Sequence, residues 1–576
     1  MKYTFLILFI FFSLFIKAQE NNRTAFQDRI DSSLVNSVFY IPGEDVFTSK
    51  FHAVNAGLNQ FSIEPELMDY SWTTKLFSSN YSEFKYVKDS IPNLLTKYDY
   101  GMDLAHWFSI DFYRPIGKSD LFLNFNRNYS DNLYSNTEVE SRNFIFGSKI
   151  HFSESNSMTI GYFNNHTIKS ESGGVLSSSE YISVDEINAF TIAPNLKTAE
   201  NIVFNNGLIL ENQIKLYSKK DSIFQDEYQF GFNLETRIEE DRLTFAMEQS
   251  DIDSGYYSNI YLDSTNTFDS IGFQKLVIKP SLYWTSKDTS KNLEIGFEKK
   301  IYDYQILTRS NIFLNSSYKK GKLTYKLNGA YELESFWKSN YSISLNIDKV
   351  YKNKNNLEFS LMVKEETPEY LFIHYSSNHH KWDTDFLSVN NQSVKLKYTV
   401  DKLNTSIEGK VDHLTNYIYF NESSVLNQTP SSILLLKVKL QNVLKFNRFE
   451  LTSGLLGQIS NSSLIRMPSF STRNSLSYNF LIRGVPLTLG SVFTYFTSYK
   501  GQSYNPAIRH FNLGTSTVGG FPVVDLFFVA RVGPADLYVK YDNLLFESEN
   551  RDMFLGSNYP LAKPFLHFGL KWNLKN

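Results

Sequence analysis

Cysteine is absent from this chain of 576 residues, and proline is scarce, with only 15 residues. Without cysteine the chain has no disulfide bonds and no thiol chemistry, which excludes folds held together by disulfide bonds. It also lacks the cysteine that a bacterial lipoprotein carries directly after its leader. Any metal site would have to use His, Asp or Glu side chains.

Long apolar runs are missing after residue 18. No later stretch approaches the roughly 18 uninterrupted apolar residues that a membrane-spanning helix needs. A strong charge of either sign is missing as well, because 57 basic residues stand against 60 acidic ones and the formal net charge is −3. This balance gives no reason to expect a nucleic-acid partner or a strongly charged substrate.

One short apolar run is present at the N-terminus, where residues 5–16 follow Lys2 and precede Ala18. A positive start, a short hydrophobic core and a small residue at the exit are the parts of a secretory signal peptide. A helix of this length would reach only about 18 Å, against a hydrocarbon core of roughly 30 Å. We therefore predict that residues 1–18 are cleaved and that the chain is exported.

Aromatic residues are plentiful, at 16% of the chain with 37 Tyr and 49 Phe, although the mean hydropathy is only −0.30. A membrane β-barrel that faces lipid on its outside and water on its inside has this combination. Secreted soluble β-proteins share it, so composition alone leaves both classes open.

Strand patterns begin at about residue 104 and recur to the end of the chain. Residues 19–80 lack them, and we interpret that stretch as an N-terminal periplasmic or partly ordered segment. The later segments have the length of about 9–11 residues that spanning strands need, whereas strands of soluble domains average about 5–6. Examples are 104–113, 120–129, 142–152, 157–166, 291–302, 321–333, 356–366, 393–403, 432–444, 449–459, 536–546 and 564–574. We predict an all-β chain whose residues 81–576 form a closed antiparallel transmembrane β-barrel of about 18–20 strands.

Two late segments show a clean period of two, which sends neighbouring side chains to opposite faces of a sheet. In each segment one face is apolar and is assigned to lipid: Leu537, Val539 and Tyr541 in 536–542, and Leu566, Phe568, Leu570, Trp572 and Leu574 in 565–574. The polar residues of the other face are candidates for lining a wet lumen: Lys540, Asp542, His567, Lys571 and Asn573.

The last strand also carries a pattern of the kind that barrel-assembly machinery recognises, with a glycine, an aromatic residue and a terminal apolar residue in alternation. An exposed final strand offers unpaired backbone groups before the barrel closes. The candidate insertion signal consists of His567, Phe568, Gly569, Leu570, Trp572 and Leu574. Lys575 and Asn576 follow it, whereas such signals usually end on the apolar residue.

Motifs of catalysis are absent: the chain has no G-x-S-x-G, no H-E-x-x-H and no P-loop. His379 and His380 would point to opposite sides of a strand and would be poorly placed to share a metal, so a loop or turn pair is favoured over a ligand set. The acidic stretch around Asp251 lacks the ligand spacing of a calcium loop, and a solvated acidic loop is favoured over a surface calcium site. We predict that the chain is not an enzyme and has no catalytic residues, no metal and no cofactor.

The last seventy or so residues carry a further set of motifs: Tyr504-Asn505-Pro506-Ala507, Phe521-Pro522-Val523-Val524-Asp525, Lys540-Tyr541, Tyr559-Pro560 and the strand Phe568 to Trp572. In this order they resemble the putative porin family of Bacteroidota-type bacteria. The resemblance covers 504–574 and is weak elsewhere, and the glycine-rich N-terminal stretch of the family is not recognisable. It implies an outer-membrane barrel acting as a porin, and it implies no catalytic residues.

We therefore expect a porin-like channel of the cell outer membrane that lets small hydrophilic solutes diffuse passively. Its partners would be outer-membrane lipid, the barrel-assembly machinery during insertion, and the solutes. The alternative is a barrel that acts as a surface receptor, an adhesin or the membrane subunit of a larger assembly. In that case the long connection 167–205, where we expect short helices, and the tract 411–431 could contact the partner. An outer-membrane hydrolase is the least favoured of the three.

Overall fold

The computed structural model describes residues 93–101, 105–130, 135–176, 192–220, 227–286, 290–303, 307–334, 339–546, 553–561, 564 and 566–575. All of them belong to the second of two compact units, residues 46–576. The predicted signal peptide 1–18, the predicted segment 19–80 and the predicted start of the barrel at 81–92 lie outside the described residues.

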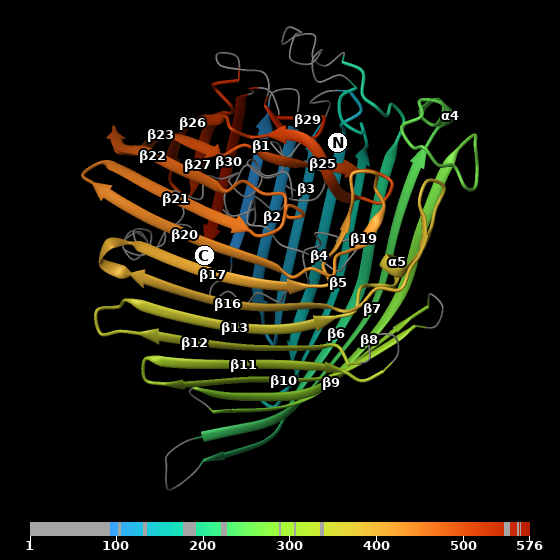
Figure 1. Cartoon of the computed structure of the whole chain (residues 1–576). Coiled ribbons are helices and arrows are strands. Elements are labelled where there is room, and N and C mark those ends of the chain that lie inside the picture. Colours follow the sequence, from blue (N-terminus) through green and yellow to red (C-terminus); the bar gives the residue numbers. More distant parts are fainter. Residues whose placement is uncertain are drawn as a thin grey trace. The chain divides into compact units, whose positions relative to one another are not determined.

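A sheet of 22 antiparallel strands closes on itself (Figure 1). The first strand, β1 (Asn93–Gly101), pairs on one side with β2 (Ala105–Ile116) and on the other with the last strand, β30 (Leu566–Lys575). Closure pairs every strand on both sides, which is what a sheet in lipid requires. The predicted class, a closed antiparallel barrel, is confirmed.

The remaining barrel strands follow in chain order. They are β3 (Ser119–Ser130), β4 (Val139–His151), β5 (Asn156–Ser170), β6 (Glu200–Lys220), β7 (Glu227–Met247), β8 (Thr267–Ser286), β9 (Lys291–Tyr302), β10 (Thr308–Lys320), β11 (Leu323–Glu332), β12 (Tyr341–Val350), β13 (Asn356–Glu366), β16 (Val389–Val400), β17 (Thr405–Thr415), β20 (Ile433–Phe446), β21 (Phe449–Ser460), β22 (Phe470–Ile482), β23 (Val485–Phe496), β26 (Pro522–Val532) and β27 (Ala535–Tyr541).

The strand number corrects the predicted 18–20, because several connections at one end of the barrel contain only two residues. β2 and β3 are joined by Gly117-Lys118, and β10 and β11 by Gly321-Lys322. Both glycines have a φ of 60°, the left-handed backbone that tight hairpin turns require. Such turns leave room for more strands in the same length of chain than the prediction assumed.

Longer connections join the strands at the opposite end. They contain the helices α4 (Gln249–Ile252) and α5 (Tyr370–Ile373) and the short strands β14 (His374–Ser376), β15 (Lys381–Asp383), β18 (Ile418–Phe420), β19 (Leu426–Gln428), β24 (Tyr499–Asn505), β25 (His510–Val518), β28 (Phe554–Gly556) and β29 (Tyr559–Pro560). β1 starts and β30 ends at the end with the short turns. Short turns at one end and long loops at the other are the outer-membrane pattern.

The two faces of the barrel wall differ in chemistry. Along β7, for example, Ile238 is an exposed apolar residue of the outward face, while Arg237 and Glu239 on either side of it form an ion pair on the inward face. Exposed leucines, isoleucines, valines and aromatic residues recur on the outward face of strand after strand. The outward face is thus apolar over the membrane-spanning region, and the inward face is mostly polar.

Six inward aromatic rings each lie on a glycine that is directly opposite in the neighbouring strand. The pairs are Phe122 with Gly147, Phe163 with Gly207, Tyr283 with Gly231, Phe313 with Gly296, Phe527 with Gly490, and Tyr538 with Gly569. A Cβ atom at any of these glycines would collide with the ring. The glycine in the predicted insertion signal therefore also has a packing role, because the ring of Tyr538 occupies the space beside it.

The long connection between β5 and β6 contains no helix in its described parts, 171–176 and 192–199. We expected short helices within 167–205, and for residues 195–201 that expectation is wrong: 195–199 are irregular and β6 begins at Glu200. A bridge between Val175 and Pro194 pairs the two described parts of this connection. Elsewhere in the described part of the chain, no helix has the length and apolarity needed to cross a bilayer.

Candidate functional site

The inner wall of the barrel is the first candidate site. On the arc from β7 to β13 most cations on the inward face are paired with a carboxylate of the same or the adjacent strand. The pairs with their N–O distances are Arg237–Glu235 (2.6 Å), Arg237–Glu239 (3.4 Å), Lys300–Glu298 (2.8 Å), Arg309–Glu332 (2.7 Å) and Lys364–Glu366 (2.6 Å). Most of these side chains are partly exposed, although Glu239 and Glu332 are buried, and pairs between exposed side chains contribute little to stability. Together they make this arc hydrophilic with little net charge.

A second feature of the wall lies where the barrel closes, and we call it the seam cluster: Asp99, Asp525, Lys540, Asp542 and His567. His567 Nδ1 lies 3.1 Å from Asp99 Oδ1, and His567 Nε2 lies 2.8 Å from Asp542 Oδ2. Lys540 Nζ lies 2.6 Å from Asp542 Oδ1 and 3.5 Å from Asp525 Oδ2. The cluster therefore links β1, β30, β27 and the start of β26.

Burial of the seam cluster is nearly complete, because its five side chains are between 0% and 4% exposed. Tyr538 donates a hydrogen bond to Asp99, and the backbone N–H of Asn543 donates to Asp525 Oδ1 at 2.9 Å. Charges this deeply buried are tolerated only when each has a partner of opposite charge or a hydrogen bond. The arrangement supplies both.

Three of the predicted lumen-facing residues, Lys540, Asp542 and His567, thus lie in the seam cluster and away from solvent. The other two, Lys571 and Asn573, lie further along β30 toward the short-turn end and are partly exposed. Of the predicted insertion signal, Phe568 is an exposed residue of the outward face. The assignments of these residues to a wet lumen and to an insertion signal remain predictions.

The second candidate site is made by the long connections, which are tied to one another and to the inner wall. We call the described residues 171–176, 192–199, 248–266, 367–388, 416–432, 497–521 and 553–561 the loop assembly. Val175 N donates to Asn558 O at 2.9 Å, and Ser557 N donates to Gln502 O at 2.9 Å. Phe420 pairs with Asn512 in a parallel bridge. Segments far apart in the sequence therefore form one structure at this end of the barrel.

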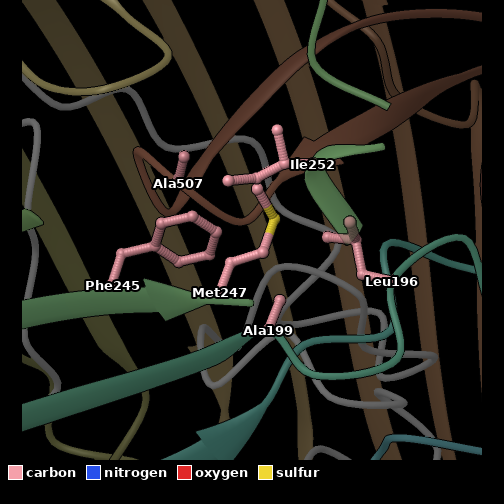
Figure 2. Close-up of a cluster of buried hydrophobic side chains, with 6 residues drawn as sticks. All are labelled: Leu196, Ala199, Phe245, Met247, Ile252 and Ala507. Atoms are coloured by element: carbon pink, nitrogen blue, oxygen red, sulfur yellow. The ribbon is translucent and has the colours of Figure 1, made fainter. Parts of the chain in front are cut away.

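An apolar cluster anchors the loop assembly to the ends of β6 and β7 (Figure 2). Phe245 and Met247 end β7, Ile252 comes from α4, and Ala507 comes from the connection between β24 and β25. Leu196 and Ala199 complete the cluster. All six side chains are buried, so their removal from water favours the closed arrangement of these loops.

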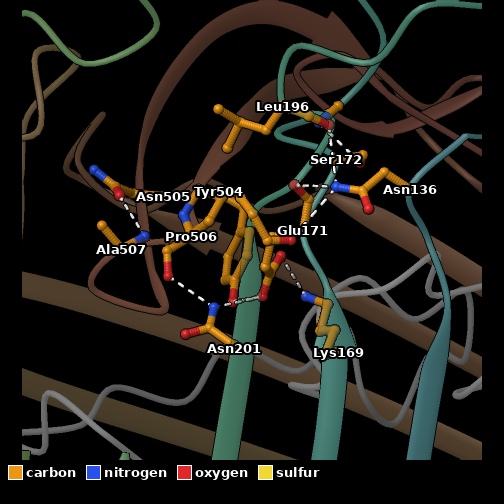
Figure 3. A network of polar contacts seen from close by, with 12 residues as sticks. Asn136, Lys169, Glu171, Ser172, Leu196, Asn201, Tyr504, Asn505, Pro506 and Ala507 are labelled. Atoms are coloured by element: carbon orange, nitrogen blue, oxygen red, sulfur yellow. Dashed lines mark hydrogen bonds and ion pairs between the residues drawn. The ribbon is translucent and has the colours of Figure 1, made fainter. Parts of the chain in front are cut away.

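Beside this cluster lies a buried polar network (Figure 3). Glu171 accepts hydrogen bonds from Asn201 Nδ2 at 2.7 Å and from the Tyr504 hydroxyl at 3.3 Å. Lys169 Nζ lies 3.0 Å from Glu171 and 4.5 Å from the centre of the Tyr504 ring. Asn201 also donates to Pro506 O at 2.9 Å. Burial raises the pKa of Glu171 above its usual value, and Lys169 and Asn201 act in the opposite direction.

Asp251 belongs to the same region, and for this residue the expectation of a solvated acidic loop is wrong, whereas Asp253 and Asp263 of the same stretch are exposed. The carboxylate of Asp251 is buried and accepts hydrogen bonds from the backbone N–H groups of Lys197 and Thr198, at 2.8 Å and 2.7 Å. It therefore fixes the turn before β6. In the described part of the chain, no group of three or more His, Asp or Glu side chains is arranged to hold a metal ion.

The histidine pair lies in a loop, as predicted, and both rings take part in the loop assembly. His379 stacks on Tyr257 with 4.4 Å between ring centres, and its Nδ1 donates to Asn259 O at 2.9 Å. His380 Nε2 accepts from Asn505 at 3.0 Å. Burial, with a smaller effect of His379, lowers the pKa of His380 to about 4, and burial lowers the pKa of His510 to about 4. Both rings are thus neutral at pH 7.

An exposed apolar tip projects from the connection between β7 and β8. Ile260, Tyr261 and Leu262 are all exposed, Leu262 to 70%. Their backbone is nevertheless held, because Tyr261 N donates to Asn378 O at 2.8 Å and Leu262 N donates to Asn378 Oδ1 at 3.0 Å. The tip is a fixed apolar surface at the long-loop end.

Sequence patterns revealed only part of these sites. The alternation in β27 and β30 identified Lys540, Asp542 and His567, but it gave no means of finding Asp99 or Asp525. Asp99 lies 468 residues from His567 in the chain, and only closure of the barrel brings the two together. The sequence singles out the motif Tyr504 to Ala507 only through its resemblance to a family. In the structure each of these four residues makes a hydrogen bond that joins the loop assembly.

The barrel is closed, apolar on the outside and polar on the inside, and its short turns lie at the end where β1 starts and β30 ends. These features define an outer-membrane β-barrel. The model of the putative porin family matches residues 65–576, and the chain belongs to this family. The family predicted from the last seventy residues is thereby confirmed, and with it the location in the outer membrane. No curated protein matches the chain in sequence.

Solved structures with a similar fold include proteins from three bacteria. The iron transporter FrpB of Neisseria meningitidis matches with a TM-score of 0.57 and 10% identity, covering 84% of this chain and 82% of that one. The ferric enterobactin receptor PfeA of Pseudomonas aeruginosa matches with 0.59 and 10%, covering 84% and 80%. The siderophore receptor PirA of Acinetobacter baumannii matches with 0.56 and 11%, covering 85% and 81%. At this identity the likeness shows the fold alone.

Proposed function

We propose that the protein is a porin-like channel through which small hydrophilic solutes diffuse passively across the outer membrane. The observation that carries this proposal is the polar inner wall of a barrel of 22 strands. Barrels of about 16–18 strands already leave an aqueous channel, and a wider one has more room. The paired charges between β7 and β13 would keep that channel wetted.

The loop assembly would form the narrow part of such a channel. It packs against the inward side chains of β5, β6 and β8, through Lys169, Asn201 and Asp269. Its apolar cluster and its buried polar network hold the loops together, so they would narrow the path as a unit. In this proposal the loop assembly governs which solutes enter and how often.

The test is to record the ionic current through the folded protein in planar lipid bilayers. We expect discrete conductance steps at pH 7, and a folded barrel that gives no steps at any voltage would overturn the proposal.

Openings should become more frequent at pH 5. The pKa of about 4 for His380 and His510 lies below the roughly 6.5 of an unburied histidine. If the loop assembly comes apart, these two histidines return to their ordinary pKa and bind protons between about pH 6.5 and pH 4. Their protonation therefore favours the separated loops, and the packed loop assembly loses stability as the pH falls.

A control for the pH effect is the double variant His380→Gln/His510→Gln, whose amide side chains take up no proton in this range. Its openings should depend much less on pH than those of the unchanged protein. An equal response of both proteins would show that other groups control the loops, and it would leave the channel itself in place.

The second candidate function is a receptor, an adhesin or the membrane subunit of an assembly. Two observations favour it: the similar solved structures are named as iron and siderophore receptors or transporters, and the tip at Ile260, Tyr261 and Leu262 offers a fixed apolar surface. Apolar patches of this kind on an exposed surface often mark binding sites. Purification under native conditions would then yield a stoichiometric partner, and bilayer recordings would show no steps.

A further inference from the structure

Five neighbouring hairpins, from β10 to β23, turn at the short-turn end of the barrel (Figure 1). The turns, with the three strand residues on either side of each, contain four carboxylates: Asp348, Glu358, Asp401 and Glu450. The same residues contain ten basic side chains, which we call the basic rim: Lys319, Lys320, Lys322, Lys349, Lys352, Lys354, Lys402, Lys445, Arg448 and Arg483. Even if each carboxylate neutralised one of them, more than half of the rim would keep its charge.

The basic rim is exposed, whereas most of the carboxylates near it are not. All ten of its side chains are exposed. Glu450 is buried, Asp348 and Glu358 are partly buried, and Asp401 alone among the four is exposed. Among the described residues, Lys445 is the one member of the rim that forms an ion pair, with Glu450 at 3.4 Å. The surface that these turns present is therefore strongly positive.

This excess of positive charge is confined to one arc of one end of the barrel. The four hairpins from β2 to β9, taken in the same way in the sequence, contain seven basic residues and six carboxylates. At the long-loop end the balance is reversed. The described residues of those connections contain thirteen carboxylates and five basic residues: Lys197, Lys381, Arg466, Lys500 and Arg509. The rim is thus a local feature and does not follow from the composition of the chain.

A girdle of apolar and aromatic side chains lies beside the basic rim on the outward face. Its exposed members are Tyr318, Tyr325, Leu444, Phe446, Phe449 and Ile482. Tyr318 stacks on Tyr325 across the hairpin of β10 and β11, with 6.5 Å between ring centres. Phe446 is 78% exposed although it has no polar group. Girdles of aromatic residues mark the level at which the hydrocarbon of a bilayer meets its headgroups.

The basic rim lies just beyond this level. Lys320 is two residues from Tyr318, and Arg448 is two residues from Phe446. At about 3.4 Å per residue and a strand tilt of about 35–45°, two residues advance roughly 5 Å along the barrel axis. Arg448 Nη1 also donates to the hydroxyl of Tyr478 at 3.5 Å, which holds the guanidinium beside the girdle. This is the depth at which lipid phosphates lie.

We propose that the basic rim binds anionic phospholipids of the periplasmic leaflet. Their phosphates would contact the lysine and arginine side chains, and their acyl chains would cover the girdle. Lysine and arginine can lay their apolar stems along such a surface while the charged ends reach the headgroups. Each basic side chain near an anionic lipid surface adds to the attraction. The girdle favours lipid over a soluble anion, because the cations border a surface that lipid covers. The inference needs only the outer-membrane barrel and does not depend on the proposed channel.

The experiment uses the whole folded protein in vesicles of phosphatidylcholine. A trace of spin-labelled phosphatidylglycerol or spin-labelled phosphatidylcholine is added, and electron paramagnetic resonance gives the share of each label that the protein immobilises. We expect the anionic label to be preferred about threefold at low salt, because several exposed cations attract it. The preference should disappear in 1 M sodium chloride, where charges are screened beyond about 3 Å.

Removing three charges of the rim, as Lys320→Gln/Lys352→Gln/Lys402→Gln, should lower the preference about twofold, since the other rim cations remain. All three side chains are exposed and lie in or beside turns, so the fold should tolerate the change. Lys354→Gln/Arg483→Gln is a second variant of the same rim, and it provides the test if the first variant folds poorly.

The matched control is Lys197→Gln/Lys381→Gln/Lys500→Gln, which removes three exposed lysines at the long-loop end. It changes the net charge by the same amount and should keep the full preference. Equal preferences in the rim variant and this control would overturn the inference, because the net charge of the protein would then explain the effect.

A competition experiment separates membrane lipid from a soluble anion. Free glycerol 3-phosphate in millimolar excess should leave the immobilised share of the anionic label unchanged, because it offers no acyl chains to the girdle. Displacement of the lipid label would overturn the assignment to phospholipid and make the rim a site for soluble phosphate. The readout does not involve conductance, so a protein that fails as a channel can still show this preference, and a conducting protein can lack it.

Discussion

Replacing Gly207 by alanine should destabilise the barrel by about 1–3 kcal/mol, or stop it from assembling, because the new Cβ has no space. It would lie 2.6 Å from Cζ of Phe163 in the neighbouring strand and 2.7 Å from the backbone oxygen of Ile238. The ring could turn away, but the backbone oxygen on the other side could not. The measurement is unfolding by urea in lipid vesicles. The folded fraction is read from gel electrophoresis, because the electrophoretic mobility of a folded barrel changes on heating.

Gly409→Ala is the matched control, since this glycine also lies inside a barrel strand but has nothing within 4 Å of its Cβ position. It should fold like the unchanged protein. The double variant Gly207→Ala/Phe163→Ala should lose less stability than the sum of the two single effects, because the new Cβ no longer meets the ring. Equal behaviour of Gly207→Ala and Gly409→Ala would show that the aromatic-on-glycine pairs do not constrain the barrel.

Replacing Lys540 by methionine should cost about 3–5 kcal/mol, the usual effect of removing one partner from a buried ion pair. The change would leave the carboxylates of Asp525 and Asp542 buried without their ammonium partner, 3.5 Å and 2.6 Å away in the unchanged protein. Methionine nearly conserves the volume, so the loss would be electrostatic. The same unfolding measurement applies.

Arg531→Met serves as the comparison, because Arg531 Nε lies 2.7 Å from Asp536, its direct partner in the neighbouring strand β27, but both side chains are partly exposed. That change should cost less than about 1 kcal/mol. Lys540→Met combined with Asp542→Asn should be less harmful than Lys540→Met alone, since it removes one uncompensated charge. If Lys540→Met and Arg531→Met cost the same, the seam cluster does not hold the barrel closed.

Strand positions could be predicted from the sequence, whereas their number could not. The segments 291–302 and 356–366 coincide with β9 and β13, because a strand between lipid and water alternates apolar and polar residues along its whole length. The count depends on the turns, and a two-residue turn such as Gly117-Lys118 leaves no gap in the pattern. The predicted segment 536–546 ends too late for a different reason: β27 ends at Tyr541, and apolar residues continue into the long connection after it as Leu544, Leu545 and Phe546.

The candidate sites depend on register and closure, which alternation does not determine. Alternation alone places Lys540 and His567 on the inward face, but only the pairing of β1 with β30 brings Asp99 to His567. Asp251 shows the opposite error, because its acidic surroundings suggested solvent while the structure buries it against Lys197 and Thr198. The sequence around a charged loop residue does not show which backbone groups that residue will contact in the folded protein.

Solute flux tests the central claim of a diffusion channel most directly. The folded protein is reconstituted into lipid vesicles that contain a large polymer, and swelling is followed after addition of uncharged sugars of increasing size. We expect the initial swelling rate to rise with the amount of protein and to fall steeply with sugar size, as the loop assembly restricts the path. Folded protein that leaves the vesicles no more permeable to the smallest sugar than protein-free vesicles would contradict the channel.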